Sequence, residues 1–116
     1  MKENLNSVLY HMIEDCEDIA SFVESVSGEE EMWANKMCRK AIIMSILNLG
    51  ELAKILENQI NLPYDRINWA GLKGMRDIAA HKYRIMTSDI VWNVAVNEIP
   101  HIHSFLLQQL QSMNQS

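Results

Sequence analysis

The spacing of apolar residues near the start of the chain is the strongest constraint on its fold. Between residues 5 and 26, apolar side chains recur at steps of 4, 3, 4, 3, 4 and 3. This spacing follows the turn of an α-helix and places the residues on one face. It predicts an amphipathic helix from about Glu3 to Val26. The apolar face is made of Leu5, Leu9, Met12, Cys16, Ile19, Val23 and Val26.

A second helix is predicted from about Glu29 to Asn58. Ser27 and Glu30 have the spacing of a capping box, and three consecutive glutamates suit the positive end of the helix dipole. Gly50 lies inside the helix and predicts close approach by a neighbouring helix. The main apolar face is Ile42, Ile46, Leu49, Ala53, Leu56 and Ile60. Burial on more than one side is expected, because this face is widened by Met37, Ile43, Met44 and Leu47.

A third helix follows a loop at residues 61–65, where Pro63 prevents continuation of the second helix. Asp65 or Asn68 can cap the third helix, which is expected to end near residues 81–83. Its apolar side is Trp69, Leu72, Met75 and Ala79.

A fourth helix is predicted from about Ser88 to Gln111, with Thr87 or Ser88 as its cap. Pro100 should kink or break it, since proline lacks a backbone N–H and clashes with the preceding turn. The polar tail at residues 108–116 is expected to fray.

Composition agrees with an all-helical chain. Of 116 residues, 48% are hydrophobic, and only four glycines and two prolines are available for turns. We therefore predict one domain over residues 1–116, an all-α, antiparallel up-and-down bundle of four main helices. No signal peptide and no apolar run of about 18 residues are present, so a cytoplasmic protein without a membrane span is expected. Cys16 and Cys38 are expected to be buried thiols, although a disulfide stays open.

Reactive side chains concentrate near the end of the third predicted helix. They are a guanidinium, a carboxylate, an imidazole and a phenol, contributed by Arg76, Asp77, His81 and Tyr83. An imidazole can exchange a proton near neutral pH, and a guanidinium can stabilise a phosphoryl group. Together they suit phosphoryl transfer. In a straight helix, however, residues five apart lie about 140° apart, so Arg76 and His81 would meet only at a helix end or across a symmetry axis.

The same segment is cationic. Residues 73–84 hold four Lys or Arg and one Asp, a formal charge of +3, whereas the whole chain has a net charge of −5. A cationic segment on an acidic protein predicts a phosphate-binding site, while the acidic net charge argues against broad coating of DNA. Lys73, Lys82 and Arg84 are the candidate phosphate ligands beside Arg76. No cluster with metal-ligand spacing is present, so neither a metal nor a cofactor is predicted.

The pattern Arg76-x4-His81-x-Tyr83, preceded by Gly74-Met75, resembles the HepT-like toxins of the HEPN ribonuclease superfamily. Further stretches resemble the same family, at residues 41–54, 67–76, 89–92 and 99–100, and the similarity covers about residues 37–108 without gaps. Asn68 and Asp77 depart from the residues that the family often has, Pro and Asn. The negative charge of Asp77 could weaken phosphate binding.

This resemblance implies a HEPN-like bundle that dimerises, acting as the toxin of a type VII HepT/MntA-like toxin–antitoxin system. It implies a metal-independent endoribonuclease in which the RNA's own 2′-hydroxyl attacks the adjacent phosphate. Arg76 and His81 would be catalytic, with Asp77 supporting them. Glu51 could orient Arg76, or it could be an ordinary surface carboxylate. The implied partner is a minimal nucleotidyltransferase antitoxin that transfers AMP to Tyr83.

A second interpretation is a non-catalytic helical subunit that binds a nucleotidyltransferase and presents its substrate. The two differ in whether the protein alone cleaves RNA. The sequence names neither the RNA nor the number of AMP units on Tyr83, and it does not give the stoichiometry with the antitoxin.

Overall fold

The structure is a computed structural model that describes residues 4–62, 67, 69–74 and 86–114. Every regular element within these ranges is helical, which confirms the predicted all-α fold. In chain order the elements are α1 (Leu5–Glu24), α2 (Glu29–Ala34), α3 (Lys36–Leu56), a helical stretch at residues 69–74, α5 (Ser88–Asn93), the π-helix η2 (Val94–Glu98) and α6 (Ile99–Asn114).

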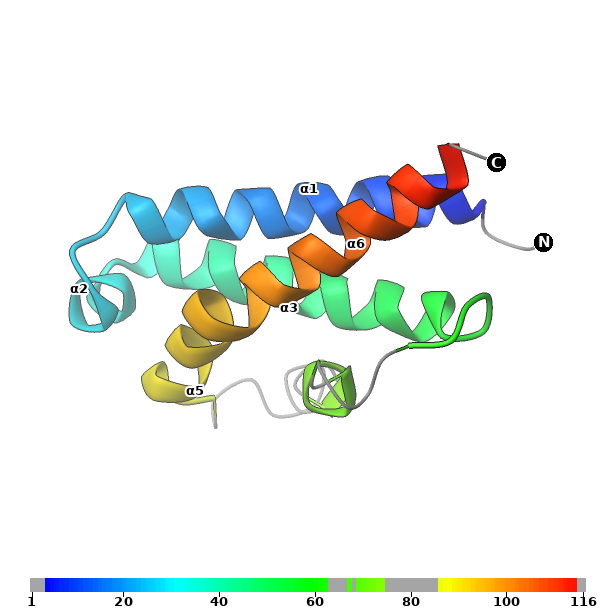
Figure 1. The fold of residues 1–116 in the computed structure, drawn as a ribbon. Helices are drawn as coiled ribbons and strands as arrows, with labels where there is room; N and C mark the ends of the chain where they lie inside the picture. Colours follow the sequence, from blue (N-terminus) through cyan, green and yellow to red (C-terminus); the bar gives the residue numbers. More distant parts are fainter. Residues whose placement is uncertain (1–3, 63–66, 68, 75–85, 115–116) are drawn as a thin grey trace.

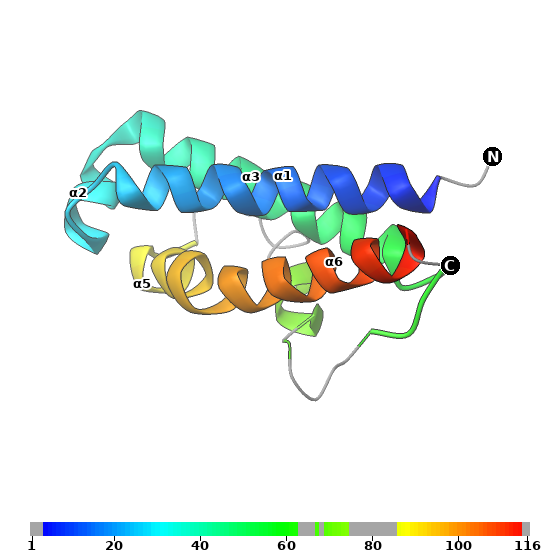
Figure 2. The same cartoon turned by 45° about the horizontal axis from the view of Figure 1, so that its top comes forward.

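Three long helices form the body of the bundle. Helix α1 packs against both α3 and α6 and runs antiparallel to each of them (Figures 1 and 2). The short helix α2 closes the end where α1 turns into α3 (Figure 1). The stretch at residues 69–74 is viewed almost end-on in Figure 1, so it crosses the bundle rather than running alongside the other helices.

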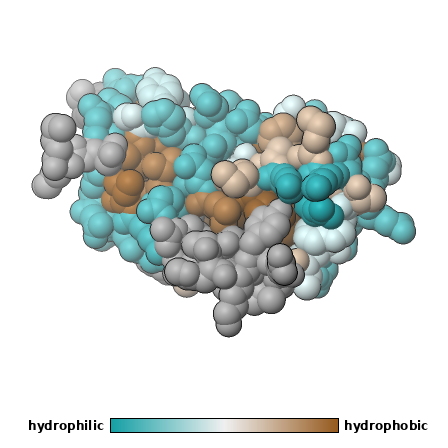
Figure 3. All heavy atoms as spheres, turned by 180° about the vertical axis from the view of Figure 1, so that it is seen from behind, coloured by the Kyte–Doolittle hydropathy of each residue, from teal (hydrophilic) through white to brown (hydrophobic). Residues whose placement is uncertain are grey.

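The core is apolar, and among the described residues no buried side chain is polar or charged. The predicted apolar face of α1 is confirmed at its centre, where Leu9, Met12, Cys16 and Ile19 are buried. Seen from behind, the surface is mostly polar, with apolar patches between the polar residues (Figure 3). A core of this kind holds the helices through burial of apolar surface.

The prediction of one helix from Glu29 to Asn58 is wrong, because the chain breaks at Asn35. The backbone of Asn35 is extended, and its side-chain oxygen accepts a hydrogen bond from the backbone N–H of Cys38 at 3.0 Å. Asparagine is a favoured N-cap, so it ends α2 and starts α3. Of the residues expected to widen the buried face, Ile43 is buried, whereas Met37 is 84% exposed and Met44 is 63% exposed, contrary to prediction.

The predicted capping box involves a different glutamate. Ser27 donates from its backbone N–H and from its hydroxyl to the carboxylate of Glu31, at 3.0 and 2.5 Å, rather than pairing with Glu30. Gly28 is the N-cap residue of α2. The hydrogen bonds from Ser27 favour the anion and hold the pKa of Glu31 below its usual value.

Pro100 distorts the last helix without breaking it. Residues Val94–Glu98 form a π-helix immediately before it, in which the N–H of Ile99 bonds to the carbonyl oxygen of Val94. The π-helical turn lets the chain stay helical although Pro100 has no backbone N–H to donate. Helix α6 continues to Asn114, so the predicted fraying from residue 108 is not observed in the described residues.

Candidate active site

Six of the eight predicted site residues lie outside the residues that the structure describes. They are Arg76, Asp77, His81, Lys82, Tyr83 and Arg84. The described residues on either side show how the segment that carries them is anchored, and Lys73 and Glu51 can be placed directly.

On the N-terminal side, the chain is held in the core by Trp69 and Leu72, which are both buried. The ring of Trp69 packs edge-on against Phe105 of α6, with 5.7 Å between the ring centres. This edge-to-face geometry is favourable for aromatic pairs. Residues 69–74 are therefore fixed against α6 immediately before the motif begins.

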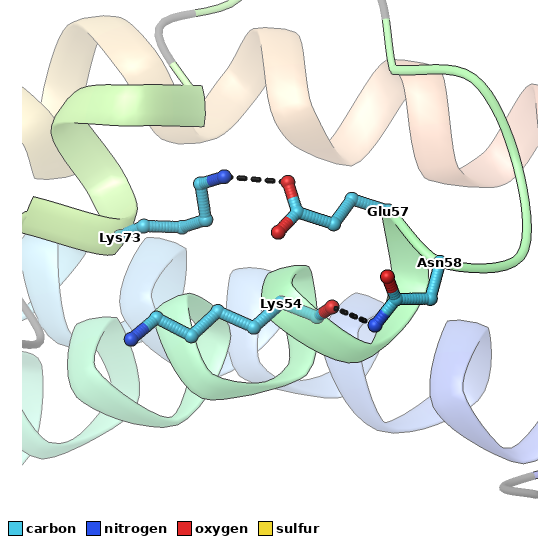
Figure 4. Close-up of polar contacts among 4 residues, drawn as sticks. All are labelled: Lys54, Glu57, Asn58 and Lys73. Atoms are coloured by element: carbon cyan, nitrogen blue, oxygen red, sulfur yellow. Dashed lines mark hydrogen bonds and ion pairs between the residues drawn. The ribbon is translucent and has the colours of Figure 1, made fainter.

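Lys73 ties the same stretch to the end of α3. Its Nζ donates to Oε2 of Glu57 at 2.5 Å, and both side chains are partly buried (Figure 4). Directly after Glu57, the side-chain Nδ2 of Asn58 donates to the carbonyl oxygen of Lys54 at 3.2 Å (Figure 4). Part of the positive charge of Lys73 is thus balanced by a carboxylate within the protein.

On the C-terminal side, the chain re-enters the core at Met86, which is buried. Thr87 occupies the predicted N-cap position of α5, but its side chain makes no cap hydrogen bond and instead donates to Asp89. The hydroxyl of Ser88 donates to the carboxylate of Glu29 at 2.9 Å and so connects α5 to α2. Both ends of the motif segment are consequently attached to the bundle.

Glu51 lies on an exposed part of α3. It is seven residues after Met44 and fourteen after Met37, so the three share one face of the helix. This face presents two exposed methionines and a carboxylate. Whether Glu51 orients Arg76 stays a prediction, because Arg76 lies outside the described residues.

Asp15 was not singled out from the sequence, yet it is the most perturbed carboxyl group in the described part of the chain. Its Oδ2 accepts a hydrogen bond from Nδ2 of Asn48 at 2.6 Å, joining α1 to α3. Partial burial raises the pKa of Asp15 from 3.8 to about 6, and the negative charges of Asp18 and Glu14 add to this effect. No sequence signal connects two residues that are 33 positions apart.

The cysteines and His103 lie in environments typical of residues that contribute to the fold. Cys16 and Cys38 are free and buried, as expected. Burial and the nearby Asp15 and Glu17 raise the pKa of Cys16 to about 12. Nε2 of His103 on α6 lies 3.3 Å from Oε2 of Glu17 on α1. Within the described ranges, no group of three His, Cys, Asp or Glu side chains could hold a metal ion, and no helix is long and apolar enough to cross a membrane.

Comparison with known proteins gives consistent matches. The family described as Ribonuclease HepT-like matches residues 12–108. Among individual relatives, "Putative RNase MJ0127" of Methanocaldococcus jannaschii is 28% identical over 86% of this chain and 82% of its own length. "Putative RNase MJ1216" of the same organism is 32% identical over 87% of this chain and 83% of its own. "Putative RNase TTE0752" of Caldanaerobacter subterraneus is 26% identical over 89% and 91%. No solved structure gives a significant match.

Proposed function

The chain belongs to the HepT-like ribonuclease family, and on this premise we propose that it is the toxin of a type VII toxin–antitoxin system, acting as a metal-independent endoribonuclease. The observation that carries the proposal is the match over residues 12–108, which includes both Arg76 and His81. The relatives are themselves named as RNases. We further propose that residues 1–116 form one cytoplasmic domain.

In the proposed reaction, His81 takes the proton from the 2′-hydroxyl of RNA as a general base. The 2′-oxygen then bonds to the adjacent phosphorus, and the bond from phosphorus to the 5′-oxygen breaks. A protonated imidazole returns the proton to the leaving oxygen, giving a 2′,3′-cyclic phosphate and a free 5′-hydroxyl. Arg76 stabilises the additional negative charge on the pentacovalent phosphorus. Asp77 positions Arg76 or His81, and Glu51 orients Arg76.

The flanking cations would hold the RNA backbone. Lys82 follows His81 directly, Arg84 comes three residues after His81, and Lys73 precedes Arg76 by three residues. Because Lys73 is paired with Glu57 at 2.5 Å, it is expected to contribute less to RNA binding than the other two.

The test is cleavage of a defined single-stranded RNA by the purified protein in EDTA. His81→Ala should lower the rate by about 10²–10⁴-fold. Arg76→Ala should also abolish cleavage, and Arg76→Lys should restore little of it, because lysine lacks the planar guanidinium fork. His101→Ala is the matched control, since this histidine is exposed and lies outside the motif. Activity that disappears in EDTA and returns with Mg²⁺ would contradict the mechanism.

We also propose a symmetric homodimer in which two copies of residues 76–83 share one cleft. It is supported by the face of α3 that carries the exposed Met37 and Met44 in line with Glu51. Light scattering at micromolar concentration should give twice the 13.4 kDa chain mass. Met44→Glu should shift the protein toward monomer, whereas Glu24→Gln, at the end of α1, should not. A wild-type protein that is strictly monomeric would refute the dimer.

Tyr83 is the proposed regulatory residue. Transfer of AMP from ATP to its phenolic oxygen, with release of pyrophosphate, would place a bulky anion seven residues after Arg76. The added phosphate could pair with Arg76 or Lys82 and so compete with the RNA backbone. Intact-mass spectrometry after co-expression with a minimal nucleotidyltransferase encoded beside this gene should show an AMP-sized increase. That increase should be lost in Tyr83→Phe and kept in Tyr10→Phe, an exposed tyrosine on α1.

The alternative is a non-catalytic subunit that binds the nucleotidyltransferase and presents its substrate. Such a protein would bind the nucleotidyltransferase but would not cleave RNA on its own. The cleavage assay with His81→Ala therefore separates the two.

A further inference from the structure

A cavity of about 370 Å³ lies between residues 69–74 and the helical stretch from α5 through η2 to α6. This volume falls within the range of ligand sites in proteins, roughly 300–1,000 Å³. None of the described residues that line it belongs to the predicted site, and the proposed reaction assigns these lining residues no role.

The lining of this cavity combines an apolar part with a negative part. Leu72 and Ile102 are both buried in the core, and they contribute the apolar part. Among the described lining residues, the polar side chains are the carboxylates of Asp89 and Glu98 and the amide of Asn93, and none is a lysine or an arginine.

These two carboxylates are the only charged side chains among the described lining residues. The Thr87 hydroxyl donates to Asp89 Oδ1 at 2.5 Å and holds the pKa of that carboxyl below its usual value. Within the described ranges, neither Asp89 nor Glu98 forms an ion pair. Uncompensated carboxylates beside apolar walls attract a cation that also has an apolar part.

The backbone around the cavity is also specialised. Val94 and Glu98, the first and last residues of the π-helix, both line the cavity. π-Helical turns are frequent at functional sites because they change the direction of side chains along a helix. Asn97 Nδ2 donates to Asn93 Oδ1 at 2.6 Å, which orients the amide at the cavity wall.

We propose that this cavity receives an arginine or lysine side chain of a protein partner. The apolar stem of such a side chain would lie against Leu72 and Ile102, and its charged end would pair with Asp89 and Glu98. Ile90 also lines the cavity and is 46% exposed, so a docked protein would cover it. RNA is disfavoured as the occupant, because its phosphates are repelled by two carboxylates. The proposal rests on the proposed function, which supplies the partner: the nucleotidyltransferase.

The test is a titration of the purified nucleotidyltransferase against the purified protein and its variants at two salt concentrations. Asp89→Asn and Glu98→Gln remove the charges with little change in shape, and the double variant should bind at least tenfold more weakly. Its affinity should also depend less on salt than that of the wild type. Asn93→Lys should weaken binding as well, since it places a cation at the cavity from within the chain. Glu14→Gln and Glu24→Gln, on exposed positions of α1, are the matched controls.

RNA cleavage is measured in parallel so that the two proposals can fail separately. Cleavage by the double variant should equal that of the wild type. If all variants bind the nucleotidyltransferase with wild-type affinity while cleavage still requires His81, the cavity proposal is overturned and the ribonuclease stands. A double variant that binds the partner normally but loses affinity for an RNA oligonucleotide would make the cavity an RNA subsite and would also overturn it. Failure of the wild-type protein to bind the nucleotidyltransferase would overturn both the partner and the cavity's occupant.

Discussion

Replacing Asp15 with asparagine should stabilise the protein at neutral pH but not at acidic pH. In the folded protein, partial burial between α1 and α3 raises the pKa of Asp15 from 3.8 to about 6. Between these two pH values the folded state binds more protons than the unfolded state. The free energy of unfolding therefore falls as pH rises from 3.8 to about 6. At pH 7.5 the full cost of burying the charged carboxylate of Asp15 is present.

The size of the effect follows from the shift. Two pKa units correspond to about 2.7 kcal/mol, since one unit is 1.36 kcal/mol. The carboxylate is only half-buried, so solvent screening reduces this to about 1–1.5 kcal/mol. Asparagine carries no charge, and its side-chain oxygen can still accept the hydrogen bond from Asn48. Asp15→Asn should thus raise the free energy of unfolding at pH 7.5 by that amount, or the melting temperature by about 5 °C.

Urea denaturation at pH 4, 5, 6 and 7.5 measures the difference between the variant and the wild type. The difference should be largest at pH 7.5 and should disappear near pH 4, where Asp15 is protonated in the folded protein. Glu24→Gln removes one negative charge from an exposed position on the same helix and controls for net charge. A variant that is no more stable than the wild type at pH 7.5 would refute the reasoning, because the hydrogen bond to Asn48 would then outweigh desolvation.

Three other perturbations follow from the described contacts. Cys16 and Cys38 are buried, so neither should react quickly with a thiol reagent in the native protein, and both should react in denaturant; rapid native labelling would contradict this. Asn35→Ala removes the cap of α3 and should cost about 1 kcal/mol in urea denaturation, whereas an unchanged midpoint would show that the cap contributes little. Trp69→Ala should cost about 3–5 kcal/mol. Trp69→Phe should cost less, since it keeps a ring against Phe105 and removes a buried indole N–H without a partner in the described residues; equal losses for the two variants would be contrary evidence.

Local sequence patterns predict the helical class and most helix positions correctly. Apolar spacing is a local signal, and the predicted face of α1 is the face whose central residues are buried. The family could also be recognised from the sequence, because the motif from Arg76 to Tyr83 is continuous in the chain. Local signals were ambiguous where several polar residues compete. Ser27 uses Glu31 rather than Glu30, and Asn35 interrupts an apolar pattern that otherwise continues.

Contacts between residues that are far apart in the chain could be found only in the folded protein. The sequence predicts Lys73 as an RNA phosphate ligand because of its positive charge. In the structure, residues 69–74 cross near the end of α3, and Lys73 pairs with Glu57. The same holds for Asp15 and Asn48, whose contact depends on how α1 and α3 pack. The cavity beside Asp89 and Glu98 is lined by residues of the crossing stretch at 69–74 and of the π-helix, which are distant in the sequence. Such features depend on the packing of whole helices, whereas sequence spacing reports only the chemistry within each helix.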